Sequence, residues 1–117
     1  MDSHLIINLL HILLIAPFLI WVGISRNTLP NPWFIVVLVL GIIVTVYHAY
    51  KALIRYTKGS SFIWVNLIHA LWVGPLLIYI GARKENAPRW SFELLLLTAF
   101  SALGYHLYNA AVYYDFK

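Results

Sequence analysis

The stretch LIINLLHILLIAPFLIWVGIS, residues 5–25, decides the fold class, because it contains no Asp, Glu, Lys or Arg. A helix that crosses the hydrocarbon core of a bilayer needs about 20 apolar residues. Three similar runs follow, and the sequence predicts helices at about 5–25, 32–56, 61–82 and 90–114. Short connections require consecutive helices to run antiparallel. We therefore predict an all-α integral membrane fold, an antiparallel four-helix transmembrane bundle in a single domain over residues 1–117.

The composition supports a multi-pass membrane location. Of the 117 residues, 62% are hydrophobic and 10% are charged, whereas a soluble domain carries about 25% charged residues. The absence of cysteine excludes disulfides, iron–sulfur clusters and thiolate metal sites. The net charge of +4 lies mainly in the connections and near the helix ends, which favours lipid headgroups over nucleic acid as the partner. The sequence shows no motif for hydrolysis or group transfer, and we assign no enzyme activity.

The chain matches itself without a gap when it is shifted by the 58 residues that separate His11 from His69. Asn-Leu-Leu-His at 8–11 aligns with Asn-Leu-Ile-His at 66–69, and Tyr-His-Ala-Tyr at 47–50 aligns with Tyr-His-Leu-Tyr at 105–108. Apolar bias alone does not match Asn, His and Tyr. We therefore predict two tandem two-helix hairpin repeats, residues 2–59 and 60–117, related by a pseudo-twofold axis along the membrane normal.

Four histidines are predicted to lie in one layer inside the bilayer. At a rise of 1.5 Å per residue, His11 lies roughly 9 Å from one face, and His48 lies roughly 12 Å from the same face because its helix runs backwards. His69 and His106 repeat this arrangement. Each helix thus contributes one histidine, and the sequence leaves open whether His11 with His69, or His48 with His106, share a centre.

Other polar side chains are predicted to support the histidines. Asn8 and Asn66 each lie three residues before a histidine, on the same helix flank. Asn109, Tyr47 and Tyr105 lie close to His106 and His48 along the chain. Lys51 and Arg55 are expected to extend toward the headgroups, which keeps their charges out of the hydrocarbon.

Three functions fit such a layer. The first is ligation by His11, His48, His69 and His106 of a b-type haem or, alternatively, of a transition metal ion, for electron transfer or metal handling. The second is a proton or small-solute channel or transporter element that uses the imidazoles. The third is a structural or assembly subunit without a cofactor, in which His, Asn and Tyr form hydrogen bonds between helices. Partners would then be the bilayer and either further copies of the chain or a larger membrane complex.

Two prolines interrupt the predicted helices. Pro17 and Pro75 occupy equivalent positions in the repeats, and each removes one backbone donor from a helix interior. We expect each proline to kink its helix and to free the carbonyl four residues earlier, at Leu13 and Leu71.

The pattern Asn-x-x-His-x5-Pro-Leu/Phe-Leu-Ile, followed by Tyr-His-x-Tyr, resembles uncharacterised small four-helix membrane proteins, some of them from large DNA viruses. The resemblance covers the repeat only. It implies a viral membrane setting and no residue roles.

Overall fold

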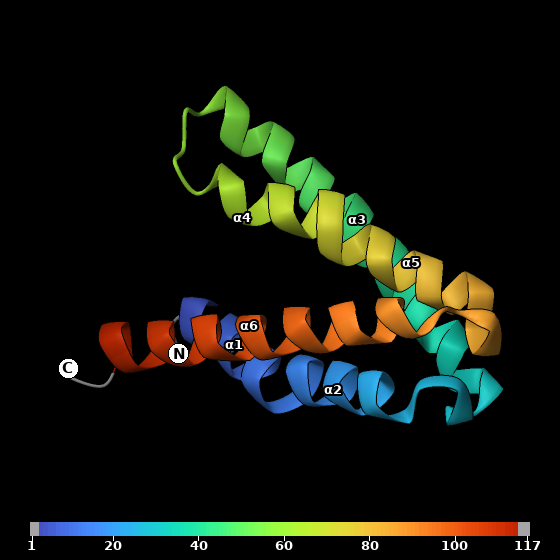
Figure 1. The fold of residues 1–117 in the computed structure, drawn as a ribbon. Coiled ribbons are helices and arrows are strands. Elements are labelled where there is room, and N and C mark those ends of the chain that lie inside the picture. The colour runs from blue at the N-terminus through green and yellow to red at the C-terminus, as the bar shows by residue number, and fades with distance from the viewer. Residues whose placement is uncertain (1–2, 115–117) are drawn as a thin grey trace. The chain divides into compact units, whose positions relative to one another are not determined.

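The computed structural model describes the backbone of residues 3–114 and the side chains of this range except at positions 4, 113 and 114. Every regular element in this range is helical (Figure 1). The all-α prediction is therefore confirmed for the described part of the chain.

The four long helices are divided as follows. The first consists of α1 (Ser3–Leu10), the π-helical turn η1 (His11–Ile15) and α2 (Ala16–Ser25). The second is the uninterrupted α3 (Asn31–Thr57). The third consists of α4 (Ile63–Ile68), the π-helical turn η3 (His69–Val73) and α5 (Gly74–Arg83), and the fourth is α6 (Arg89–Tyr114). Two 3-10 turns, η2 (Arg26–Thr28) and η4 (Lys84–Asn86), lead into the connections before α3 and α6.

Four helices are long and apolar enough to cross a membrane: Leu5–Thr28, Asn31–Thr57, Ile63–Asn86 and Arg89–Val112. These ranges agree with the predicted runs to within a few residues, except that the 3-10 turns extend the first and third. The agreement is consistent with a multi-pass membrane protein. Insertion in a bilayer stays a prediction, which rests on length and composition.

The described helices form two compact units that do not coincide with the predicted repeats. Within the described range, one unit combines residues 3–26 with 92–114, and the other contains residues 27–91. In the second unit α3 packs along α4, η3 and α5 as an antiparallel hairpin (Figure 1). In the first unit Asn8 contacts His106 and Gly23 lies beside Leu96, so the first and fourth helices also run antiparallel.

Buried side chains recur at the spacing of the sequence match. The equivalent pairs Leu19 and Leu77, Val22 and Ile80, Phe34 and Phe92, and Val37 and Leu95 are all buried. The π-helical turns and the left-handed residues Arg26 and Lys84 recur at the same spacing. The two copies of the sequence motif therefore adopt the same local structure.

Two equivalent glycines allow the helices of each unit to approach closely. A Cβ atom at Gly81 would lie 2.5 Å from the backbone nitrogen of Leu38, and one at Gly23 would lie 2.6 Å from Cγ of Leu96. Real Cβ atoms do not approach other heavy atoms so closely. Gly81 therefore permits backbone-to-backbone contact of α5 with α3, as small residues do at helix interfaces in membranes.

The substitution Gly81→Ala should lower the free energy of unfolding in detergent by about 1–3 kcal/mol, because the added methyl group overlaps backbone atoms of α3. Gly104→Ala is the matched control, since a Cβ atom there meets nothing within 4 Å. Both changes favour the helix by about 1 kcal/mol through helix propensity. A difference in stability between the two variants therefore reports the overlap of the new methyl group at position 81 with α3. Equal stability of the two variants would contradict the close approach at Gly81.

Candidate functional site: two Asn–His–His clusters

The predicted histidines meet in two pairs, each within one unit. The first cluster consists of Asn8, His11 and His106, where the rings of His11 and His106 stack with centroids 4.2 Å apart and planes 25° apart. The second cluster consists of His48, Asn66 and His69, where the rings of His48 and His69 stack at 4.3 Å and 22°. The pairs left open by the sequence, His11 with His69 and His48 with His106, each join residues of different units, so a centre shared by either pair stays a prediction.

A π-helical turn begins at one histidine of each cluster and ends two residues before a proline. The amide of Ala16 donates to the carbonyl oxygen of His11, and the amide of Gly74 donates to that of His69. Because proline lacks an N–H and its ring clashes with the carbonyl four residues earlier, one extra residue in the turn relieves both problems. Pro17 and Pro75 then lie in the first turn of α2 and α5. A π-helical turn thus lies where each kink was predicted, and the kink itself stays a prediction.

The same two histidines are oriented by their own helices. Nδ1 of His11 lies 2.8 Å from the carbonyl oxygen of Ile7, and Nδ1 of His69 lies 2.7 Å from that of Val65. A carbonyl only accepts, so each Nδ1 carries the proton and donates it. In the neutral ring the lone pair then resides on Nε2, which fixes the tautomer of both residues.

The asparagines anchor the histidines of the opposite helices. In the first cluster Oδ1 of Asn8 lies 2.7 Å from Nδ1 of His106, and both residues are buried, with 7% of each exposed. In the second cluster Nδ2 of Asn66 lies 2.9 Å from Nδ1 of His48, and Asn66 is 3% exposed. The predicted supporting role of Asn8 and Asn66 therefore has a direct geometric basis.

Arg55 is a member of the second cluster that the sequence reasoning missed. Its Nη1 lies 2.7 Å from Oδ1 of Asn66 and 3.3 Å from the carbonyl oxygen of Phe62, so the guanidinium points into the unit rather than only toward the headgroups. A signal was available in the spacing, since Arg55 follows His48 by two helical turns on the same face of α3.

The other residues predicted to support the histidines are Tyr47, Tyr105 and Asn109. Tyr47 and Tyr105 place their rings edge-on to His48 and His106, with centroids 5.1 Å and 5.3 Å apart. Both tyrosines are exposed, so they cover one side of the histidines toward the outside of the unit. Asn109 is half-buried one turn after His106. Its supporting role stays a prediction.

The stacked pairs do not fit a haem. Axial imidazoles bind iron from opposite faces of a flat macrocycle, so the macrocycle lies between them. Rings in van der Waals contact at 4.2 Å and 4.3 Å leave no room for it. Among the residues that the structure describes, no three His, Cys, Asp or Glu side chains gather closely enough to hold a metal ion. Each cluster offers two imidazoles to such an ion, and metal binding stays a prediction.

Comparisons with protein-family models, with curated proteins and with solved structures find no match to this chain. The functional inference therefore rests on the geometry of the two clusters. The resemblance to small viral membrane proteins stays a prediction.

The substitution Asn66→Ala should lower the free energy of unfolding in detergent by about 1 kcal/mol, because it removes hydrogen bonds to His48 and Arg55 that are worth about 0.6 kcal/mol each between membrane helices. The matched control is Asn109→Ala, which makes the same change on α6 and is expected to cost less. A loss of stability in Asn66→Ala no larger than that in Asn109→Ala would contradict the stabilising role of the Asn66 hydrogen bonds.

Proposed function

We propose that this chain is a multi-pass membrane protein whose two Asn–His–His clusters take up and release protons inside the bilayer, and that it serves as a proton-transfer element, either alone or as a homo-oligomer. The observation that supports this proposal is the stacking of two imidazoles in each cluster, with the Nδ1 atom of every ring held by a defined partner.

Imidazole is the side chain whose ordinary titration range lies nearest to neutral pH, and it donates and accepts hydrogen bonds at once. A stacked pair of imidazoles binds one added proton more readily than a second, because two adjacent imidazolium ions would repel each other. Each cluster is thus suited to the exchange of a single proton. Ionisable residues within membrane-spanning helices mark ion and proton pathways in many proteins, because their burial is costly without a function.

The clusters lie in apolar surroundings along each helix. Nearby hydroxyl groups are engaged by their own helices, since Thr45 donates to the carbonyl oxygen of Gly41 and Thr98 to that of Leu94. A proton that leaves a cluster toward the opposite face of the membrane therefore needs water as its carrier. Assembly of several copies of the chain would supply a path for that water.

We further propose that the clusters arose by tandem duplication of a two-helix hairpin, residues 2–59 and 60–117. The support is that Asn8, His11 and His48 correspond by sequence to Asn66, His69 and His106. Each cluster contains an Asn and a His from the first helix of one copy and a His from the second helix of the other copy. An ancestral hairpin would form the same clusters as a homodimer.

The decisive experiment is proton flux into liposomes that contain the purified protein and a pH-sensitive dye. The expected result is flux that exceeds that of protein-free liposomes between about pH 5 and pH 8 and that falls about tenfold when all four cluster histidines are replaced by Gln. The matched control is His4→Gln, which removes the remaining histidine of the chain and should leave the flux unchanged. Wild-type flux equal to that of empty liposomes over this range would refute the proposal.

Binding of a transition metal ion is the second candidate, and one observation favours it. Histidines that bind metals almost always donate the second ring N–H to a carbonyl or carboxylate oxygen, and His11, His69 and His106 have such partners at Nδ1. Further ligands would come from water or from another copy of the chain. Equilibrium dialysis against Zn²⁺ and Cu²⁺ tests this candidate, which requires bound metal in the wild type and its loss when all four cluster histidines are replaced by Gln.

A further inference from the structure

The two clusters are equivalent by sequence, and an arginine takes part in the second cluster. In the second cluster the Arg55 guanidinium donates to Oδ1 of Asn66 at 2.7 Å. The equivalent position in the second repeat is occupied by Tyr113, which carries no positive charge. The consequence of this difference appears in the orientation of the two asparagine amides.

The guanidinium of arginine has donors only, so the Asn66 atom that faces it must be the carbonyl oxygen. The Nδ2 group of the same amide then points at Nδ1 of His48, at 2.9 Å. Because Nδ2 donates, Nδ1 of His48 must accept, and the neutral His48 ring carries its proton on Nε2.

The first cluster has the opposite arrangement. Oδ1 of Asn8 faces Nδ1 of His106 at 2.7 Å, so Nδ1 of His106 donates and the lone pair of the neutral ring resides on Nε2. His106 thus shares its tautomer with His11 and His69, and His48 alone among these four histidines has the other.

The tautomers decide where an added proton can go. His106 can accept a proton on Nε2 while it keeps the bond from Nδ1 to Asn8. His48 would have to accept on Nδ1, which already faces the Asn66 donor group. This step requires the Asn66 amide to turn over, and turning it would place its NH₂ group against the Arg55 guanidinium.

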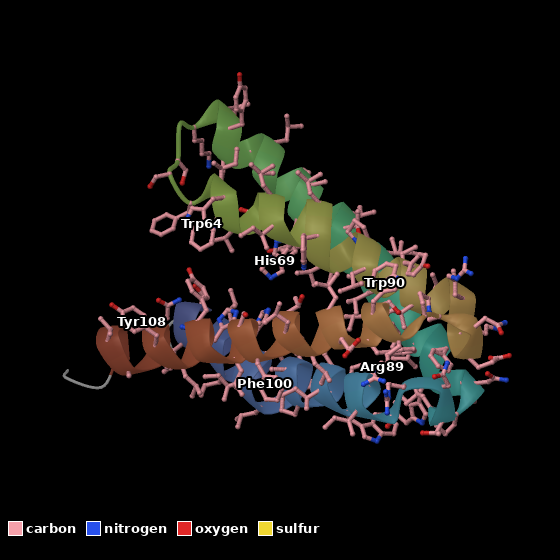
Figure 2. All side chains as sticks on the ribbon, in the orientation of Figure 1. Trp64, His69, Arg89, Trp90, Phe100 and Tyr108 are labelled. Atoms are coloured by element: carbon pink, nitrogen blue, oxygen red, sulfur yellow. The ribbon has the colours of Figure 1, made fainter. Side chains whose placement is uncertain are left out.

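We propose that Arg55 is a positioning residue that locks His48 in the Nε2–H tautomer, so that His48, in contrast to His11, His69 and His106, takes up a proton only after the Asn66 amide turns over. Its assigned role in proton transfer rests on the proposed function, whereas the tautomer assignment does not. Among the described side chains, the titratable or charged groups that contact His48 include the rings of Tyr47 on α3 and of His69 at the start of η3, which Figure 2 labels, and Arg55 reaches His48 through Asn66. Lys51 follows His48 by one turn of α3. The described groups of this kind in contact with His106 include Tyr105 on α6 and His11.

The tautomers can be measured by ¹⁵N nuclear magnetic resonance of the histidine-labelled full chain in detergent micelles, where protonated and unprotonated ring nitrogens give separate signals. The wild type is expected to show Nε2–H at His48 and Nδ1–H at His11, His69 and His106. Arg55→Met should convert His48 to the Nδ1–H pattern, because the Asn66 amide is then free to turn. Lys58→Met is the matched control, since it removes an exposed cation from the end of α3 and should leave the pattern unchanged.

A second variant tests the tautomer of His48 if Arg55→Met does not fold. Asn66→Asp retains Arg55 and offers only acceptor oxygens, so Nδ1 of His48 must become a donor and show the same conversion. A wild-type His48 with Nδ1–H, or a His48 pattern unchanged in both Arg55→Met and Asn66→Asp, would overturn the positioning role of Arg55.

Flux measurements in liposomes test the difference between His106 and His48. His106→Gln is expected to lower proton flux about tenfold, and His48→Gln should lower it by less than about threefold, because His106 accepts a proton on Nε2 without rearrangement and His48 does not. A larger loss in His48→Gln than in His106→Gln would overturn the different roles of the two residues. The predicted tautomers together with a wild type that gives no flux would refute the proposed function and leave the positioning role of Arg55 supported.

Discussion

A polar side chain buried between apolar helices must keep its hydrogen bonds, and this requirement organises both units of the chain. Asn8, Asn66 and His106 are buried, and each has a partner on the opposite helix of its unit or on its own helix. A buried amide or imidazole without a partner would cost about 1–3 kcal/mol. The partners therefore specify which helices pair and in which register, because a shift of one helical turn would separate Asn8 from His106 and Asn66 from His48.

The backbone supports the same arrangement. A π-helical turn precedes each proline, and the turn begins at the histidine whose Nδ1 donates one turn back along its own helix. Gly23 and Gly81 then bring the helices of each unit close together farther along the same interface. Histidine, proline and glycine thus act at successive levels of one helix, and the sequence match repeats all three in the other copy.

Much of the fold could be predicted from the sequence, because the charge-free runs and the charged connections give the lengths and ends of four helices. The equal depth of the histidines was also accessible, since it follows from helical rise alone, and the stacking of His11 with His106 agrees with it. The choice of partners was not accessible, because antiparallel helices of similar length and apolar character can pair in several ways. The role of Arg55 was not predicted for a related reason. The side chain of an arginine near a helix end can extend to the lipid headgroups or bind a buried acceptor. Only the position of Asn66 on the neighbouring helix decides between these two placements.

The central claim is that the histidines pair within the units, His11 with His106 and His48 with His69. Solid-state nuclear magnetic resonance of the ring-¹³C-histidine-labelled chain in lipid bilayers measures this pairing through space. The account predicts a cross-peak for each pair, and it predicts that His11→Gln removes the first and retains the second. Cross-peaks that instead join His11 to His69 or His48 to His106, or the absence of any contact between histidine rings, would contradict the account.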